Sequence, residues 1–148
     1  MLSSKPRSAR PLSFLDNVAR IQVEGAECRN AYALVEMTAP QGDMPPLHVH
    51  GRDDEGFYVL DGRLTLFVGR RKIELDAGEC AVAPCGTPHT YRAELDGTRW
   101  LVVCSPAGFE EFVRDVAAAE RDPAVLAEIS ARHGIEILGP PGTLPSEV

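Results

Sequence analysis

Short apolar runs separated by turn residues occupy the central part of the chain. They read as strands because they are short, rich in β-branched residues and bounded by Gly, Pro, Asp or Asn. They cover residues 18–24, 31–39, 55–60, 63–68, 72–76, 80–83, 89–94 and 99–104. Since no helical periodicity is interleaved among them, the pattern predicts an all-β, antiparallel sandwich or barrel.

Two Asp-Gly pairs punctuate these runs. Asp61-Gly62 lies between two apolar runs, and Asp96-Gly97 repeats the arrangement further along the chain. Asp-Gly favours the positive φ angles of a two-residue hairpin turn. We therefore expect β-hairpins at both pairs.

The pattern becomes helical after Pro106. The apolar residues at 109, 112, 113, 116 and 117 share one face of a helix. A second helix is expected between Asp122 as N-cap, with Pro123 at its first position, and Gly134 as its stop. Helices this short are not stable alone in water, so both should pack on the β-body, as a lid over its mouth or as support for a dimer.

Chain length and composition suit one domain. The chain has 148 residues, of which 44% are apolar, enough for one core and too few for two comfortable ones. We expect a flexible N-terminal tail over 1–14, a β-barrel over 15–106, and a helical segment with a tail over 107–148.

Charge and hydropathy exclude several partners. The net charge is −7 and no Lys/Arg cluster follows the backbone spacing of nucleic acid, which argues against such a partner. No apolar run is long enough to cross a bilayer, so no membrane association is expected. The basic first thirteen residues lack the apolar core of a signal peptide, and the expected location is cytoplasmic.

The four cysteines do not form a Cys-x-x-Cys motif. Cys80 and Cys104 lie in apolar runs, which predicts buried, inert thiols, whereas Cys85 lies in a turn and should be exposed. A Cys80–Cys85 disulfide is compatible with the spacing, but a cytosolic setting argues against it.

Three of the four histidines are candidate metal ligands. His48 and His50 are two residues apart, so in a strand both imidazoles point to one face. Glu55 follows after a short turn, and His89 begins a later strand. Three imidazoles and a carboxylate suit a divalent transition metal and leave coordination positions open. Alternatively, a single histidine on a strand face is an ordinary hydrogen-bonded polar residue.

Residues of the same strand parity could surround this site. Phe57 and Val59 share the parity of Glu55, and Tyr91 shares that of His89, so these three could line an apolar substrate pocket. They could equally be core.

Four other polar or aromatic residues are not expected to bind metal. Asp53 and Asp54 are expected in solvent. His133 is expected at a helix C-terminus, where a cation is favourable, and Trp100 in the core.

The spacing of these residues resembles the two motifs of the cupin superfamily. The first reads Gly42, five residues, His48-x-His50, four residues, Glu55, six residues and Gly62; the second reads Gly78, five residues, Pro84-x-Gly86, two residues and His89. The resemblance implies a jelly-roll (double-stranded β-helix) barrel with two C-terminal helices packed on it. It also implies metal ligation by His48, His50, Glu55 and His89. Ala93 departs from the family, which usually has Asn there, and this leaves substrate contacts open.

Residues 45–50, 57–62 and 105–112 are similar to small quercetin 2,3-dioxygenase-type cupins. This resemblance implies a metal-dependent dioxygenase that acts on a small enolisable or phenolic, flavonol-like substrate together with dioxygen. Glu55 would be the catalytic base. The cofactor would be one divalent ion of Fe, Mn, Ni, Co, Cu or Zn, and the assembly a homodimer.

Two other functions use the same site. One is a non-oxidative metal enzyme, such as an isomerase, cyclase or decarboxylase, which needs the Lewis acid without dioxygen. The other is a cupin that binds a small molecule and catalyses nothing.

Overall fold

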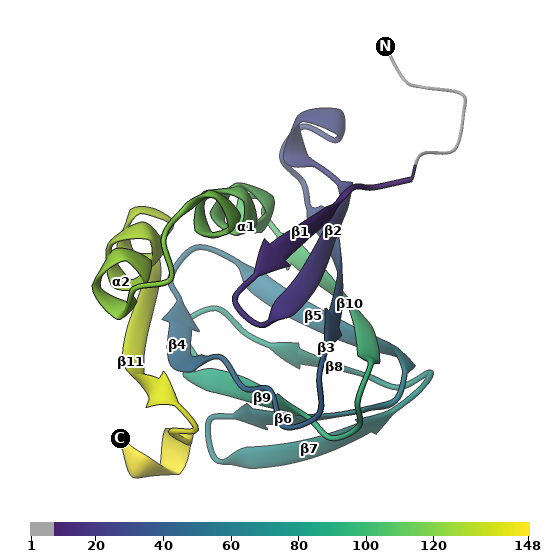
Figure 1. The fold of residues 1–148 in the computed structure, drawn as a ribbon, viewed down its shortest axis with the longest axis vertical. Coiled ribbons are helices and arrows are strands. Elements are labelled where there is room, and N and C mark those ends of the chain that lie inside the picture. The colour runs from purple at the N-terminus through teal and green to yellow at the C-terminus, as the bar shows by residue number, and fades with distance from the viewer. Residues whose placement is uncertain (1–7) are drawn as a thin grey trace.

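The computed structural model describes residues 8–148, and these are mostly β-strand (Figure 1). The first seven residues of the predicted tail lie outside the described residues. The strands are β1 (Pro11–Phe14), β2 (Asn17–Val23), β3 (Ala33–Ala39), β4 (Pro46–His50), β5 (Asp54–Asp61), β6 (Arg63–Val68), β7 (Arg71–Asp76), β8 (Cys80–Ala83), β9 (His89–Ala93), β10 (Thr98–Ser105) and β11 (Ile135–Pro141). The helices are α1 (Phe109–Ala118) and α2 (Pro123–Arg132), with 3-10 turns at Gly25–Glu27 and Pro145–Glu147.

The strands form two antiparallel sheets in a jelly-roll arrangement. One sheet has the order β1-β2-β3-β10-β5-β8, and the other has the order β11-β4-β9-β6-β7. The all-β jelly roll was predicted. Among the described strands, however, pairing does not continue from one sheet to the other, so the predicted barrel is not closed and consists of two facing sheets.

Both predicted Asp-Gly hairpins are wrong, although both glycines do have positive φ, 83° at Gly62 and 74° at Gly97. Asp61-Gly62 joins β5 of one sheet to β6 of the other, and Asp96-Gly97 joins β9 to β10 across the sheets in the same way. The turn residues fix the local backbone angle, but partner choice depends on long-range packing that the dipeptide does not encode.

Strand alternation builds the core between the sheets. In β3 every second residue is buried, including Val35 and Met37. In β10, which pairs with β3, Trp100 and Val102 point inward with the same period, and Trp100 is fully buried as predicted. Such alternation is what a sheet with one buried and one wet face requires.

Two edge strands were not predicted. Pro11–Phe14 belongs to β1, so the predicted tail over 1–14 is too long at its C-terminal end; Phe14 is buried there. The segment around Pro140, which we expected to begin a loose end, continues β11 and pairs with β4. Both segments contain proline, which edge strands tolerate because one side of the strand needs no hydrogen-bond donors.

The two helices form where the sequence predicts them. The Asp122 side chain accepts hydrogen bonds from the backbone N–H groups of Ala124 (2.7 Å) and Val125 (3.4 Å), as expected of an N-cap. The helices lie together at one end of the sandwich, where α1 contacts β1 and α2 contacts β11 (Figure 1). Among residues 8–148, no helix is long and apolar enough to cross a membrane.

The cysteines partly match expectation. Cys104 is buried and Cys85 is exposed, as predicted, but Cys80 is exposed, so its predicted burial is wrong. Cys80 pairs with Tyr58 on the outer face of the sheet, and Tyr58 is also exposed. All four thiols are free.

Candidate metal centre

The four predicted ligands lie together inside the sandwich. One ligand atom from each of His48, His50, Glu55 and His89 can be chosen so that all four lie within 4.8 Å of one another. β4 carries the first two, β5 carries the carboxylate and β9 carries the last. His48 is paired directly with His89 across β4 and β9, and the centroids of the two imidazole rings lie 4.4 Å apart.

In each of the three histidines, Nδ1 lies within hydrogen-bond distance of an acceptor oxygen outside the cluster. His48 Nδ1 lies 2.7 Å from the Pro46 carbonyl oxygen, and His89 Nδ1 lies 2.9 Å from that of Thr87. A carbonyl oxygen only accepts, so each Nδ1 carries the hydrogen and, in a neutral ring, each Nε2 keeps its lone pair. Outer partners of this kind orient histidines that ligate metals.

The inner atoms fit a bound cation. Glu55 Oε2 lies 2.9 Å from His89 Nε2 and 3.2 Å from His50 Nε2. Two atoms that both present lone pairs repel at this distance unless a proton or a metal ion lies between them. The buried His50 Nε2 also has no hydrogen-bond partner among the described residues. This mixed nitrogen and oxygen donor set suits a divalent transition metal.

Burial and mutual charge set the protonation of the cluster. Burial, and then the neighbouring His89 and His50, lower the pKa of His48 to about 3. Burial raises the pKa of Glu55, but the imidazoles outweigh it and lower that pKa to about 2. Burial lowers the pKa of His50, and the carboxylates of Glu55 and Asp53 outweigh it, so that pKa is raised. At neutral pH His48 is therefore neutral and Glu55 is ionised, which are the metal-binding forms.

An apolar cavity of about 50 Å³ adjoins the cluster. Phe57 and Tyr91 line it as predicted. Val59 does not belong to the lining; its side chain is fully buried in the core. Tyr91 is also 5.0 Å from the ring of Trp100, which lines the same cavity.

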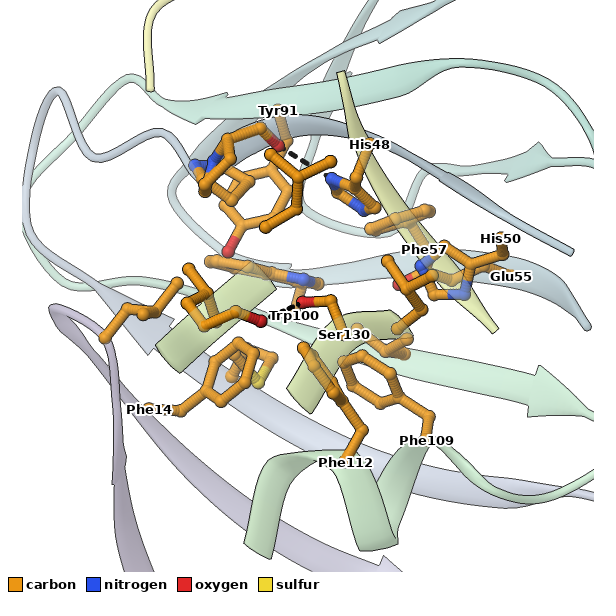
Figure 2. A pocket seen from close by; sticks show the side chains of 18 residues that line it. Phe14, His48, His50, Glu55, Phe57, Tyr91, Trp100, Phe109, Phe112 and Ser130 are labelled. Atoms are coloured by element: carbon orange, nitrogen blue, oxygen red, sulfur yellow. Dashed lines mark hydrogen bonds and ion pairs between the residues drawn. The ribbon is translucent and has the colours of Figure 1, made fainter. Parts of the chain in front are cut away.

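The C-terminal helices roof this cavity. Phe109 and Phe112 of α1 and Leu126 and Ser130 of α2 are among its lining residues (Figure 2). Phe112 packs edge-on against Phe14 of β1, with ring centroids 5.7 Å apart. The helices thus cover the cavity, which is the position that the expected lid role requires.

One residue beside the cluster escaped sequence reasoning. Asp53, expected in solvent, is only 12% exposed, and its Oδ1 lies 3.0 Å from His50 Nδ1. It sits in the turn between β4 and β5, and the turn folds it back onto a histidine three residues earlier. The alternation of a strand does not tell where the side chain of a turn residue points. The sequence signal for this contact is the acidic residue three positions after the candidate ligand His50. Asp54 is exposed as expected.

The departure at Ala93 falls in the core. Its side chain is fully buried, and its backbone N–H donates to the Asp43 carbonyl (3.0 Å) while its carbonyl accepts from Gly42 N–H (2.7 Å). It does not line the cavity beside the cluster. The missing Asn side chain therefore bears on the packing of β9 rather than on that cavity.

His133 was not predicted to be a ligand, and it forms a hydrogen bond with Asp115.

A second cavity of about 480 Å³ shares five lining residues with the first: Leu15, Pro45, Pro46, Tyr91 and Leu126. Asp43 and Asn17 lie on its wall, and Asn17 Nδ2 donates to the Tyr91 hydroxyl oxygen (2.7 Å). The second cavity thus adjoins the first and is the larger of the two.

Asp43→Asn should stabilise the protein above pH 6 and change little at pH 4. Burial, and then Asp16, raise the pKa of Asp43 to about 6. A carboxyl whose pKa is raised on folding costs stability as pH rises from its unfolded pKa through its folded one. The full shift corresponds to about 3 kcal/mol, which solvent screening of this partly exposed group reduces to about 1 kcal/mol.

Urea unfolding of the Asp43→Asn variant at pH 4 and pH 8 measures this difference, with Asp61→Asn, an exposed site, as the control for lost charge. An equal effect of Asp43→Asn at both pH values would contradict the assignment.

Comparison with known proteins points to the same class as the sequence motifs. Residues 35–104 match the cupin domain family, and these residues contain all four cluster members. The two-sheet jelly roll agrees with this match.

The chain is also similar in sequence to individual curated proteins. The chain is 38% identical to quercetin 2,3-dioxygenase of Bacillus subtilis over 86 residues, which are 58% of this chain and 26% of that protein. The chain spans less than half the length of the curated relatives it matches.

Two solved structures share the fold. The polyketide cyclase RemF from Streptomyces resistomycificus is 21% identical, with a TM-score of 0.58 over 71% of this chain and 79% of that one. A predicted oxalate decarboxylase from Thermotoga maritima is 16% identical, with a TM-score of 0.63 over 71% and 99%.

Proposed function

We propose that this cupin is a metal-dependent dioxygenase for a small enolisable or phenolic substrate. The observation that carries the proposal is the cluster of three histidines and Glu55 at the wall of an apolar, aromatic-lined cavity. The 38% identity to a quercetin 2,3-dioxygenase supports the choice of reaction.

In this proposal the four cluster residues bind the metal ion, and one of them also accepts a proton. His48, His50, Glu55 and His89 would hold one divalent ion of Fe, Mn, Ni, Co, Cu or Zn. When bound, the ion supplies a Lewis acid that favours the ionised form of a substrate enol or phenol. The Glu55 carboxylate would accept the hydroxyl proton, because each histidine would be committed to the ion through one nitrogen and has its other nitrogen next to a fixed acceptor.

The cavity favours small substrates. A space of about 50 Å³ is far below the roughly 300 Å³ at which pockets for drug-sized ligands begin. A three-ring flavonol therefore needs α1 and α2 to move, or needs to extend into the second cavity of about 480 Å³. A single-ring phenol or a 1,3-dicarbonyl needs less additional space than a flavonol.

An oxygen electrode tests the proposal. We expect metal-loaded protein to consume dioxygen with at least one member of a panel of flavonols, catechols and 1,3-dicarbonyls, and metal-free protein to consume none. Turnover without oxygen uptake would instead support a non-oxidative enzyme, a candidate favoured by the structural likeness to a polyketide cyclase and a predicted oxalate decarboxylase. Binding without conversion, in air and anaerobically, would support a non-catalytic small-molecule-binding cupin.

Asp53→Ala should lower metal affinity about tenfold. Loss of the carboxylate leaves His50 Nδ1 without its acceptor, and partners of this kind contribute roughly 10–100-fold to metal affinity. Asp53→Asn, which keeps a side-chain oxygen, should restore part of the loss. Competition with a chromophoric chelator measures the affinity. Exposed Asp61 provides the control for lost charge, and an equal loss in Asp61→Ala would contradict the role of Asp53.

We also expect a homodimer. Val82 and Val103 flank Gly56 across three paired strands, with Tyr58 beside them, and the three side chains are 56%, 40% and 43% exposed. This makes an apolar patch on the outer face of the six-stranded sheet. Light scattering should give twice the chain mass, and Val82→Lys should halve it while Leu95→Lys, in a loop, does not. A monomeric unmodified protein would refute the expectation.

A further inference from the structure

The only tryptophan of the chain presents an unused hydrogen-bond donor at the metal cavity. Trp100 is fully buried and lines the cavity that adjoins the cluster. Its indole Nε1 has no hydrogen-bond partner among the described residues. A buried indole N–H ordinarily finds an acceptor, and an unpaired one costs stability. An acceptor that arrives with the ligand would account for this arrangement.

The other polar side chains of the cavity are already engaged. The Tyr91 hydroxyl oxygen accepts from Asn17, and the Ser130 hydroxyl donates to the Leu126 carbonyl oxygen (2.7 Å). The remaining polar side chains are those of the metal cluster. Around them the lining is aromatic or aliphatic, and Figure 2 shows Trp100 amid these side chains, among them Phe14 and Phe112. The indole is therefore a donor set in an apolar wall, apart from the cluster.

We propose that the Trp100 N–H donates a hydrogen bond to an acceptor oxygen of the substrate. The inference rests on the proposed function and specifies its substrate class. That substrate has an apolar ring, one enol or phenol oxygen for the metal cluster, and a second oxygen, a carbonyl or an ether, for Trp100. The aromatic cavity of about 50 Å³ is smaller than the roughly 150 Å³ that holds benzene, so α1 and α2 move to admit the ring. A donor in an apolar wall rejects analogues that lack the second oxygen, because burying the unpaired N–H against them costs affinity.

Two matched probes test this step directly. 3,4-Dihydroxyacetophenone carries a catechol and a carbonyl oxygen, whereas 4-isopropylcatechol has nearly the same shape without the carbonyl. Zinc-loaded protein is used because Zn²⁺ has no redox chemistry. Since the chain has one tryptophan, its ¹H–¹⁵N spectrum holds one indole signal.

We expect the ketone to move the indole proton downfield, as a new hydrogen bond does, and the isopropyl probe to leave it near its free position. By calorimetry, Trp100→Phe should weaken binding of the ketone about tenfold and leave binding of the isopropyl probe within about twofold. Comparing the two probes removes any general effect of the smaller ring.

Three results would overturn the inference. One is binding of both probes with equal indole shifts. Another is a ligand-free indole signal that moves in Ser130→Ala, since this would show that the N–H is already bonded to the Ser130 hydroxyl. Failure of both catechols to bind zinc-loaded protein would instead contradict the proposed metal chemistry, and the inference with it.

Discussion

His48→Ala should abolish metal binding and catalysis together. The imidazole is one of four donors within 4.8 Å of one another, and its orientation is fixed by the Pro46 carbonyl oxygen. Removing a direct ligand should cost more than the roughly 10–100-fold that a lost outer partner costs, so we expect metal affinity to fall by more than about 100-fold. Metal content after dialysis and oxygen uptake with a turned-over substrate measure the two effects.

His133→Ala is the matched control, because His133 is the one histidine outside the cluster and pairs with Asp115 at 2.6 Å. It should keep its metal and its activity. Full metal content in the His48→Ala variant would remove His48 from the ligand set.

Glu55→Gln should separate metal binding from turnover. The amide keeps an oxygen that can ligate, but it cannot accept and hold a proton as the carboxylate does. The pKa of Glu55, held to about 2 by the surrounding imidazoles, keeps the native carboxylate ionised throughout the working pH range. We expect the variant to retain part of its metal while kcat falls by about 10²–10⁴, the usual contribution of a positioned base.

The control for lost charge is Glu74→Gln, at an exposed site on β7 paired with Lys72. It should leave turnover unchanged. A Glu55→Gln variant with full turnover and full metal would contradict the assignment of Glu55 as the base.

Local sequence features made the cluster of His48, His50, Glu55 and His89 predictable. A two-residue separation fixes the parity of His48 and His50 whatever the rest of the fold does, and the spacing to Glu55 and His89 matched the cupin motifs. The second helix was predictable for the same reason, because Asp122 as N-cap and Pro123 at the first position mark its start within a few residues. In these cases the information lies within a few residues of the feature.

Features that depend on distant partners were not predictable in this way. The pairing of Pro11–Phe14 with β2 and of Ile135–Pro141 with β4 is decided at sheet edges, where weak strand formers succeed because a partner is present. Val59 has the parity of Glu55 but lies too far along β5 to line the cavity, so it joins the core. Asp53 reaches His50 only because of the shape of a turn.

Elemental analysis of the purified protein tests the central claim most directly, because every step of the proposed chemistry depends on one ion at this cluster. The account predicts close to one equivalent of a divalent transition metal per chain, lost in His48→Ala and kept in His133→Ala. Protein that neither carries such a metal nor takes up one equivalent on titration with Fe, Mn, Ni, Co, Cu and Zn salts would contradict it.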